Sequence, residues 1–283
     1  MRERRLFAEH SLHESSLTAL LLISLTVLLV ILILLLPLLV VFGYAFEQGA
    51  QAVVTALTNE HALHALSLTV QAAVLAVICN LVFGLSAAWC LARFRFPGRS
   101  ILLTVLDLPF AISPIIAGML FVLLYGLHGY FAPLLKAFDV QIIFAFSGVV
   151  MATIFVTLPF IARELIPLME ELGSSEEEAA LTMGASGWQM FWHVTIPNIR
   201  WGIIYGVILT NARAMGEFGA VSVVSGHLRG ETNTLPLHIE ILYNEFHTQA
   251  AFACAALLAC LALLTLVLKA AIEFWRGGAQ ASH

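Results

Sequence analysis

The sequence predicts an all-α, polytopic membrane protein that crosses the bilayer about six times. Of its 283 residues, 60% are hydrophobic and only 11% are charged, and its mean hydropathy is strongly positive; both are typical of integral membrane proteins. The apolar runs are continuous and do not alternate with polar residues, which favours helices over the strands of a barrel. Because a spanning helix takes about 20 residues, roughly six spans fill the chain. We therefore expect a single transmembrane domain over residues 1–283.

The predicted spans follow from the apolar runs in chain order. The first uncharged run, residues 15–46, is too long for a cleaved signal, so it predicts a retained helix at about 17–41 behind a polar head at 1–16. Turn or charge signals bound the later runs, which predict spans at about 66–92, 101–127, 141–167, 198–224 and 250–274. Leu235, Ile239 and Leu242 follow helical spacing and predict a short surface helix between the last two spans.

The distribution of lysine and arginine predicts the orientation of the chain in the cytoplasmic (inner) membrane. Most basic residues near span ends fall on one side: Arg2, Arg4, Arg5, Arg93, Arg95, Arg99, Arg163, Arg200, Lys269 and Arg276. Only Lys136 and Arg229 fall on the other side. Both termini, the head at 1–16 and the loop at 168–197 are therefore expected in the cytoplasm, which agrees with an even number of spans.

Composition and motifs also exclude several functions. A net charge of −5 without a basic face argues against a nucleic-acid partner. The cysteines lie in apolar stretches without disulfide or metal-ligand spacing, so we expect no metal site; they are Cys79, Cys90, Cys254 and Cys260. Neither lysine, Lys136 nor Lys269, follows the glycine-rich turn of a P-loop. We therefore expect no enzyme and no bound cofactor in this chain, and any ATP hydrolysis must come from another subunit.

The loop at 168–197 has the signals of a short helix. Ser174 and Ser175 are each followed three residues later by glutamate, Glu177 and Glu178, and both pairs fit a capping box. Three consecutive glutamates would place negative charge at the positive end of a helix that starts near Ser175. The alternative is an ordinary amphipathic loop whose glutamates are only solvated.

Later residues of this loop predict how the helix ends and what surrounds it. Gly184 can bend or end the helix, and Pro197 suits the first turn of the next span. Three aromatic residues follow the glycine, and we interpret them as anchors at the membrane interface; they are Trp188, Phe191 and Trp192.

Ionisable residues inside predicted spans need partners or a function, since charge is costly in a bilayer. Arg213 and Glu217 are four residues apart and can form an ion pair on one helical face. Alternatively, Arg213 lines a translocation path for an anion, with Thr210 and Asn211 as neutral hydrogen-bond donors. Asp107 lies near the cytoplasmic end of its span, where we expect a structural role.

The segment 178–197 resembles the EAA motif of ABC importer permeases. Glu178-Ala179-Ala180 is followed after three residues by Gly184, and after nine more by Val-Thr-Ile196-Pro197. In that family the motif forms a short cytoplasmic helix that inserts into a groove of a separate ATPase subunit. The resemblance implies that coupling to the ATPase runs through the loop 175–197, on the residues Glu178, Ala179, Ala180, Gly184, Ile196 and Pro197.

Five further segments narrow the resemblance: 93–99, 108–118, 184–191, 197–201 and 209–226. Together they are similar to CysW-type permease subunits of sulfate/thiosulfate ABC importers, over residues 35–275. The sequence departs from the pattern of these permeases in the N-terminal head, the loop 127–140 and the short C-terminus.

This resemblance implies a type I ABC importer permease fold and a set of partners. These are a CysT-like second permease subunit, two copies of a CysA-like ATP-binding subunit that uses the ATP, an extracytoplasmic sulfate/thiosulfate-binding protein, and membrane lipid.

Other functions predict different behaviour. A molybdate or tungstate ABC permease would keep the mechanism and change the anion. A secondary transporter would use Arg213, Glu217 and Asp107 as an ion relay and would work without an ATPase. An intramembrane hydrolase is disfavoured, because Ser186 lies in the charged loop without a supporting histidine on a neighbouring span.

Overall fold

The computed structural model describes the backbone of residues 16–280 and the side chains of residues 18–272, and within that part every regular element is a helix. The all-α prediction is confirmed. The elements are α1 (Ser16–Val30), η2 (Ile31–Leu35), α2 (Leu36–Phe46), α3 (Ala50–Leu57), α4 (Glu60–Arg93), α5 (Arg99–Leu106), α6 (Leu108–Ala111), α7 (Pro114–Tyr125), α8 (Ala132–Ala137), α9 (Phe146–Thr157), α10 (Pro159–Leu172), α11 (Ser175–Thr182), α12 (Gly187–Met190), η3 (Phe191–Thr195), α13 (Ile196–Met215), α14 (Gly219–Ser225), α15 (Leu235–Asn244) and α16 (Thr248–Gln280). The predicted head at 1–16 lies almost wholly outside the described residues. The side chains beyond residue 272, including that of Arg276, also lie outside them.

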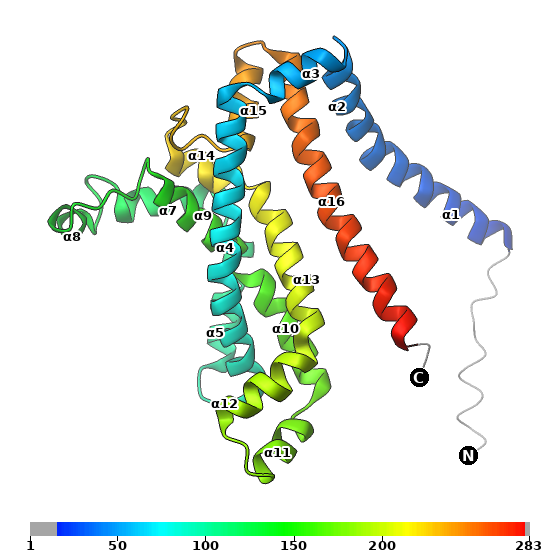
Figure 1. Ribbon diagram of the computed structural model, residues 1–283, viewed down its shortest axis with the longest axis vertical. Coiled ribbons are helices and arrows are strands. Elements are labelled where there is room, and N and C mark those ends of the chain that lie inside the picture. The colour runs from blue at the N-terminus through cyan, green and yellow to red at the C-terminus, as the bar shows by residue number, and fades with distance from the viewer. Residues whose placement is uncertain (1–15, 281–283) are drawn as a thin grey trace.

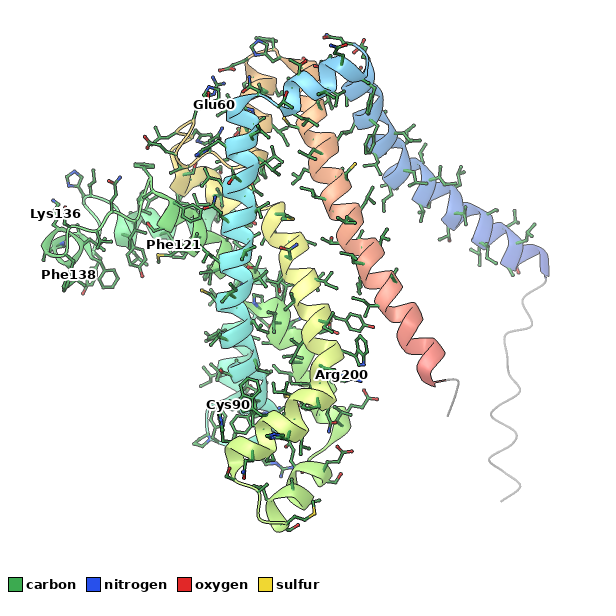
Figure 2. The ribbon with its side chains drawn as sticks, viewed as in Figure 1. Glu60, Cys90, Phe121, Lys136, Phe138 and Arg200 are labelled. Atoms are coloured by element: carbon green, nitrogen blue, oxygen red, sulfur yellow. The ribbon has the colours of Figure 1, made fainter. Side chains whose placement is uncertain are left out.

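The molecule has two well-separated ends. Figure 1 shows α11 and α12 together at one end of the long axis and α3 and α15 at the other. Helix α4 runs between these ends, and Figure 2 shows Glu60 at its α15 end and Cys90 near its α11 end. A tilted lobe of α7, α8 and α9 projects to one side, with Lys136 and Phe138 at its tip.

The first predicted span forms one long apolar helix. Residues Thr18–Phe46 run through α1, η2 and α2 for 29 residues, and none of its most apolar window is buried within this chain. Its side chains are apolar on every face, as suits a helix surrounded by lipid or by another subunit. Only its second half packs on the body, where Tyr44 stacks on Phe252 with ring centroids 5.0 Å apart.

Helix α4 is the longest element of the core. Its 34 residues extend about 51 Å. Asn59 caps the first turn by accepting a hydrogen bond from the backbone N–H of His61, and Arg93 lies in the last turn, where the helix dipole favours a cation. The buried face is made mostly of alanine and glycine, so α10 and α13 approach closely.

Gly84 of α4 lies close to α10. A Cβ atom at this position would lie 2.9 Å from Cβ of Ile161, a side chain that is itself fully buried. We expect Gly84→Val to lower the free energy of unfolding by about 1–3 kcal/mol through overpacking, measured by thermal unfolding in detergent. Gly43→Val is the matched control, since no atom lies within 4 Å of its added Cβ. Equal losses from both variants would contradict this packing.

The predicted span 101–127 is not one helix, and this prediction is corrected. It divides into α5, α6 and α7, with breaks at Asp107 and at Ile112–Ser113. Proline lacks a backbone N–H and disfavours helical geometry at the preceding residue. Pro109 follows the first break, and Pro114 follows the second, where Ser113 has an extended ψ of 134°. The unbroken apolar character of the run concealed both breaks.

The predicted span 198–224 is also divided. Helix α13 ends at Met215, residues Gly216–Phe218 leave the helical path, and α14 begins at Gly219. The span predicted at 141–167 corresponds to a helical segment of the same length shifted by five residues, Phe146–Leu172, which comprises α9 and α10. The span predicted at 250–274 corresponds to a longer helix, Thr248–Gln280. In the described residues, four helices are individually long and apolar enough to cross a membrane: Thr18–Phe46, Glu60–Arg93, Phe146–Leu172 and Thr248–Ile272. The chain is thus a multi-pass membrane protein, and the count of six stays a prediction.

Among the described side chains, the buried apolar ones form three clusters. The largest joins α4, α5, α10 and α13 in the half towards α11, around Ile161, Leu165 and Met169. A second joins α4, α9, α14 and α15 around Val149 and Val221. A third, small cluster holds α4, α15 and α16 together at the opposite end. The α11 end and the α15 end are therefore both fixed to α4.

Candidate functional site

The loop predicted to couple the chain to a partner lies at the end of the molecule. Its predicted helix is confirmed as α11, Ser175–Thr182, and the chain then turns at Gly184 with φ of 93°. The Gly184 N–H donates to the carbonyl of Leu181 over 3.0 Å, which closes the last turn. Residues with a Cβ atom disfavour this left-handed conformation, whereas glycine adopts it without steric cost, so glycine suits this turn.

The two capping boxes predicted for α11 are wrong. Ser174 is the N-cap residue, but its side chain makes no capping bond and instead donates to Glu178 Oε1 over 2.6 Å. The capping box of this loop begins the next helix: Gln189 Oε1 accepts from the Ser186 N–H over 2.9 Å, and Ser186 Oγ accepts from the Gln189 N–H over 3.3 Å. Glu177 is not available for local capping, because a partner from α4 binds it.

Glu177 is the buried centre of a polar network. The Arg93 guanidinium donates two hydrogen bonds to the Glu177 carboxylate, from Nε to Oε2 over 2.6 Å and from Nη2 to Oε1 over 3.2 Å. Nη1 of Arg93 donates to the carbonyl of Met169 on α10 over 2.6 Å. Thr195 adds a fourth bond, since its Oγ1 donates to Glu177 Oε1 over 2.7 Å. The side chains of Arg93 and Glu177 are only 11% and 9% exposed, so this pair is largely withdrawn from water.

Sequence reasoning missed this network. The sequence pattern assigns Glu177 to a capping box with Ser174 and to the acidic start of a helix, and it assigns Arg93 to a span end. No local pattern connects the two residues, because 84 positions separate them. The neighbouring Glu176 has a partner too, since it accepts a hydrogen bond from the Asn198 amide at the start of α13.

The residues of the EAA-like segment divide between surface and interior. Glu178, Ala179, Gly184 and Pro197 are exposed, Ile196 is half-buried, and Ala180 is turned inward at 7% exposure. Large apolar side chains lie exposed beside them, namely Leu181, Met183, Trp188 and Trp192. Phe191 is half-buried, and its ring contacts Trp89 edge-on at 5.2 Å. The end of the molecule therefore presents a partly apolar surface, which is typical of a protein–protein interaction site.

The predicted ion pair between Arg213 and Glu217 is confirmed. Nη1 of Arg213 lies 2.6 Å from Oε2 of Glu217. The glutamate side chain is only 1% exposed, and its other oxygen accepts the Ala220 N–H over 2.9 Å. Glu217 thus joins the end of α13 to the first turn of α14 across the break, where a carboxylate favours the helix start. Arg213 is 35% exposed, so part of its guanidinium faces outside this chain.

The two neutral residues predicted beside Arg213 have different surroundings. Thr210 is fully buried, and its hydroxyl has no hydrogen-bond partner among the described residues. Asn211 is half-buried, with its amide 3.7 Å from the sulfur of Met215. Thr210 is thereby directed into the core of this chain, while Asn211 and Arg213 stay partly accessible.

Asp107 has the structural role expected of it, with a partner that sequence reasoning did not identify. Arg163 of α10 donates two parallel hydrogen bonds of 2.7 Å, from Nε to Oδ1 and from Nη2 to Oδ2. The guanidinium also lies 5.2 Å from the Phe110 ring centre. This bidentate pair holds the broken segment α5–α6 against α10. Among the described residues, no group of three histidine, cysteine, aspartate or glutamate side chains could hold a metal ion.

At the opposite end, the helix predicted around Leu235, Ile239 and Leu242 is confirmed as α15, but its first turn is buried and not at the surface, and it includes a buried histidine. His238 is 3% exposed, with the Asn233 amide 3.5 Å from its Nδ1. Burial lowers the pKa of His238 below its ordinary 6.5, and the nearby charges of Arg229 and His61 lower it further, against an opposing effect of Glu245. His238 is therefore held neutral.

This histidine predicts a pH dependence of stability. Because the folded pKa lies below the unfolded value of 6.5, the contribution of His238 is complete above that pH and is lost as pH falls below it. The slope reaches at most about 1.4 kcal/mol per pH unit. We expect the melting temperature in detergent to drop between pH 7.5 and pH 5.5 more steeply for the wild type than for His238→Gln. Parallel curves would exclude His238 as the source.

Comparison with known proteins gives a consistent picture. Residues 80–276 match the family described as "Binding-protein-dependent transport system inner membrane component". The chain is 56% identical to the sulfate transport system permease protein CysW of Synechocystis sp., over 89% of this chain and 92% of the relative. It is 53% identical to CysW of Escherichia coli (strain K12), over 85% and 82%. It is 38% identical to the sulfate transport system permease protein CysT of the same strain, over 74% and 76%.

Among solved structures, the fold resembles a chain from the crystal structure of a bacterial alginate ABC transporter in complex with an alginate pentasaccharide-bound periplasmic protein. The TM-score is 0.74 at 20% sequence identity, and the alignment covers 89% of this chain and 92% of that chain.

Proposed function

The chain belongs to the binding-protein-dependent transport system inner membrane components, and from this premise we propose that it is the permease subunit of an ATP-driven importer for sulfate and thiosulfate. The relatives named as the sulfate transport system permease protein CysW are 49–56% identical to it. The observation that carries the proposal is the α11–Gly184 segment: a short helix at one end of a membrane bundle, anchored inward by Glu177 and exposing Glu178, Ala179 and Gly184.

In this proposal the α11 end faces the cytoplasm. Support comes from the arginines, since Arg93, Arg95, Arg99 and Arg200 lie on segments at or near that end, as the positive-inside rule requires. Figure 2 shows Arg200 in the part of α13 nearer to α12. The chain would then be a multi-pass protein of the inner membrane with both termini in the cytoplasm, and α15 would face the extracytoplasmic side.

The proposed complex contains a CysT-like second permease, two CysA-like ATPase subunits and an extracytoplasmic binding protein for the anion. The 38% identity to a CysT protein supports pairing of two related but different permease chains. ATP would bind to the ATPase subunits, and this chain would bind no cofactor or metal. We propose that Glu178, Ala179, Ala180, Gly184, Ile196 and Pro197 form the segment coupled to the ATPase.

For the translocation path we propose a divided role for the charged pair. Glu217 is structural, because it is buried and bonded to the start of α14. Arg213 is held by Glu217 and contributes positive potential where its guanidinium is exposed, and Asn211 of the same helix is also partly accessible. Weak attraction suits a permease, since the anion has to be released as well as admitted.

The anion is tested by competition. Labelled sulfate uptake is measured in proteoliposomes that contain this chain, its candidate permease and ATPase partners and the binding protein. We expect ATP-dependent uptake that excess thiosulfate suppresses and molybdate suppresses only weakly. ATP-dependent uptake of labelled molybdate without uptake of sulfate would assign the chain to molybdate transport instead.

A further inference from the structure

We propose that Arg93 and Glu177 form the link that passes movement of the coupling helix α11 to α4, and through α4 to α15 at the opposite end of the molecule. Arg93 is thus inferred to be a positioning residue for energy coupling. This inference rests on the function proposed above, because it assumes that an ATPase acts on α11.

Helix α11 is attached to the membrane helices chiefly by polar side chains. Helix α11 packs directly on α12 and η3, its neighbours in sequence. A cavity of about 110 Å³ lies between α11 and the ends of α10 and α13, lined by Arg93, Gly173, Glu177, Thr195 and Asn198 among others. Apolar packing does not fill this space, so hydrogen bonds and one ion pair must carry force across it.

The contact between Arg93 and Glu177 has a fixed geometry. The side-on pairing of a planar guanidinium with a carboxylate fixes both distance and angle, which a single contact between point charges does not. Nη1 of Arg93 donates to the Met169 carbonyl, and Thr195 donates to the same carboxylate from η3. Glu177 of α11 is therefore bonded directly to α4 and η3, and α10 is joined to this network through Arg93. Because the pair is largely buried, water screens it little.

Helix α4 connects this contact to α15 at the opposite end of the molecule. The helix has no break between Glu60 and Arg93, and rigid elements of this kind move as bodies in hinge and shear transitions. Its far end packs on α15 through Ala62, Ala65 and Leu235, and the Thr69 hydroxyl accepts the Leu235 N–H over 2.7 Å. A displacement of α11 would thus reach α15 through one side-chain link and one helix.

A neighbouring ion pair provides the matched control. Arg99 donates to Glu170 of α10 at the same end of the molecule, but this pair is 36% and 48% exposed and does not reach α11. Both arginines also bind a backbone carbonyl, Arg99 that of Leu91 and Arg93 that of Met169. Arg99→Gln therefore removes a similar set of bonds without cutting the proposed link.

The test measures sulfate transported per ATP hydrolysed by the complete complex in proteoliposomes, with wild type, Arg93→Gln, Glu177→Gln, Thr195→Val and Arg99→Gln. We expect Arg93→Gln and Glu177→Gln to keep the ATPase subunits bound and hydrolysing ATP while the ratio falls at least about 10-fold. Thr195→Val, which preserves shape, should lower the ratio about 2–5-fold, because it removes only one hydrogen bond of the network. Arg99→Gln should keep the wild-type ratio.

The double variant Arg93→Gln/Glu177→Gln should be no worse than either single variant, because both remove the same link. Ratios for Arg93→Gln and Glu177→Gln equal to that of Arg99→Gln would overturn the inference. So would loss of assembly in these two variants together with a wild-type ratio in Thr195→Val, since the network would then only hold the fold. A wild-type complex without ATP-dependent uptake would instead refute the proposed function, which separates the two failures.

Discussion

Replacing Gly184 with aspartate is expected to abolish ATP-dependent sulfate uptake while the membrane body stays folded. Gly184 has φ of 93°, and no atom of this chain lies within 4 Å of an added Cβ. The substitution therefore meets no clash inside the chain, and its effects are backbone strain of about 1–3 kcal/mol at the turn and a new charge on the surface proposed to enter the ATPase. Since each 1.4 kcal/mol changes an equilibrium constant about tenfold, we expect ATPase binding and uptake to fall on the order of 100-fold.

Two matched variants separate strain from the added charge. Gly187→Asp adds the same charge three residues away, at an exposed glycine with ordinary φ in the first turn of α12, and should transport within about twofold of wild type because acidic residues suit a helix start. Gly184→Asn should lose less than Gly184→Asp, because asparagine tolerates the left-handed conformation and carries no charge. If Gly184→Asp transported normally, the α11–Gly184 turn would not be the coupling segment.

Removal of the Glu217 carboxylate is the second change with a large expected effect. Glu217→Ala leaves Arg213 without its partner and the Ala220 N–H without its acceptor. Because the remaining charge, Arg213, is 35% exposed, we expect a loss of about 1–3 kcal/mol, below that for a fully buried pair, which corresponds to a melting temperature about 2–12 °C lower for a protein of this size. The measurement is thermal unfolding of the purified chain in detergent.

The same pair allows a sharper comparison. The double variant Arg213→Met/Glu217→Leu removes both charges at similar volume and should recover most of the lost stability, as buried pairs replaced by apolar residues usually do. If Arg213 also attracts the anion, this stable double variant should still transport poorly. A double variant as unstable as Glu217→Ala would show that the Ala220 contact, and not the charge pair, dominates.

The sequence predicted those features that depend on local pattern. The helix starting near Ser175 follows from adjacent residues, and the ion pair of Arg213 with Glu217 follows from a spacing of four on one helical face; both are confirmed. The apolar runs located the helices, since burial in lipid requires only that a long segment stay apolar. The number of spans and the orientation remain predictions.

Features set by tertiary structure could not be predicted in the same way. The capping boxes at Ser174 and Ser175 satisfied a local rule, yet Glu177 pairs with Arg93 because a buried bidentate contact outweighs a capping bond of about 1 kcal/mol. The breaks near Pro109 and Pro114 had a signal in the prolines, but helix-breaking residues are tolerated in membrane spans, so this signal alone was ambiguous.

The source of energy for transport tests the account most directly. Sulfate uptake is measured in proteoliposomes with the complete complex, with the ATPase subunit omitted, and with this chain alone under an imposed proton or sodium gradient. We predict uptake only in the complete complex with ATP, and none driven by a gradient. Gradient-driven uptake by this chain alone would contradict the importer account and identify a secondary transporter.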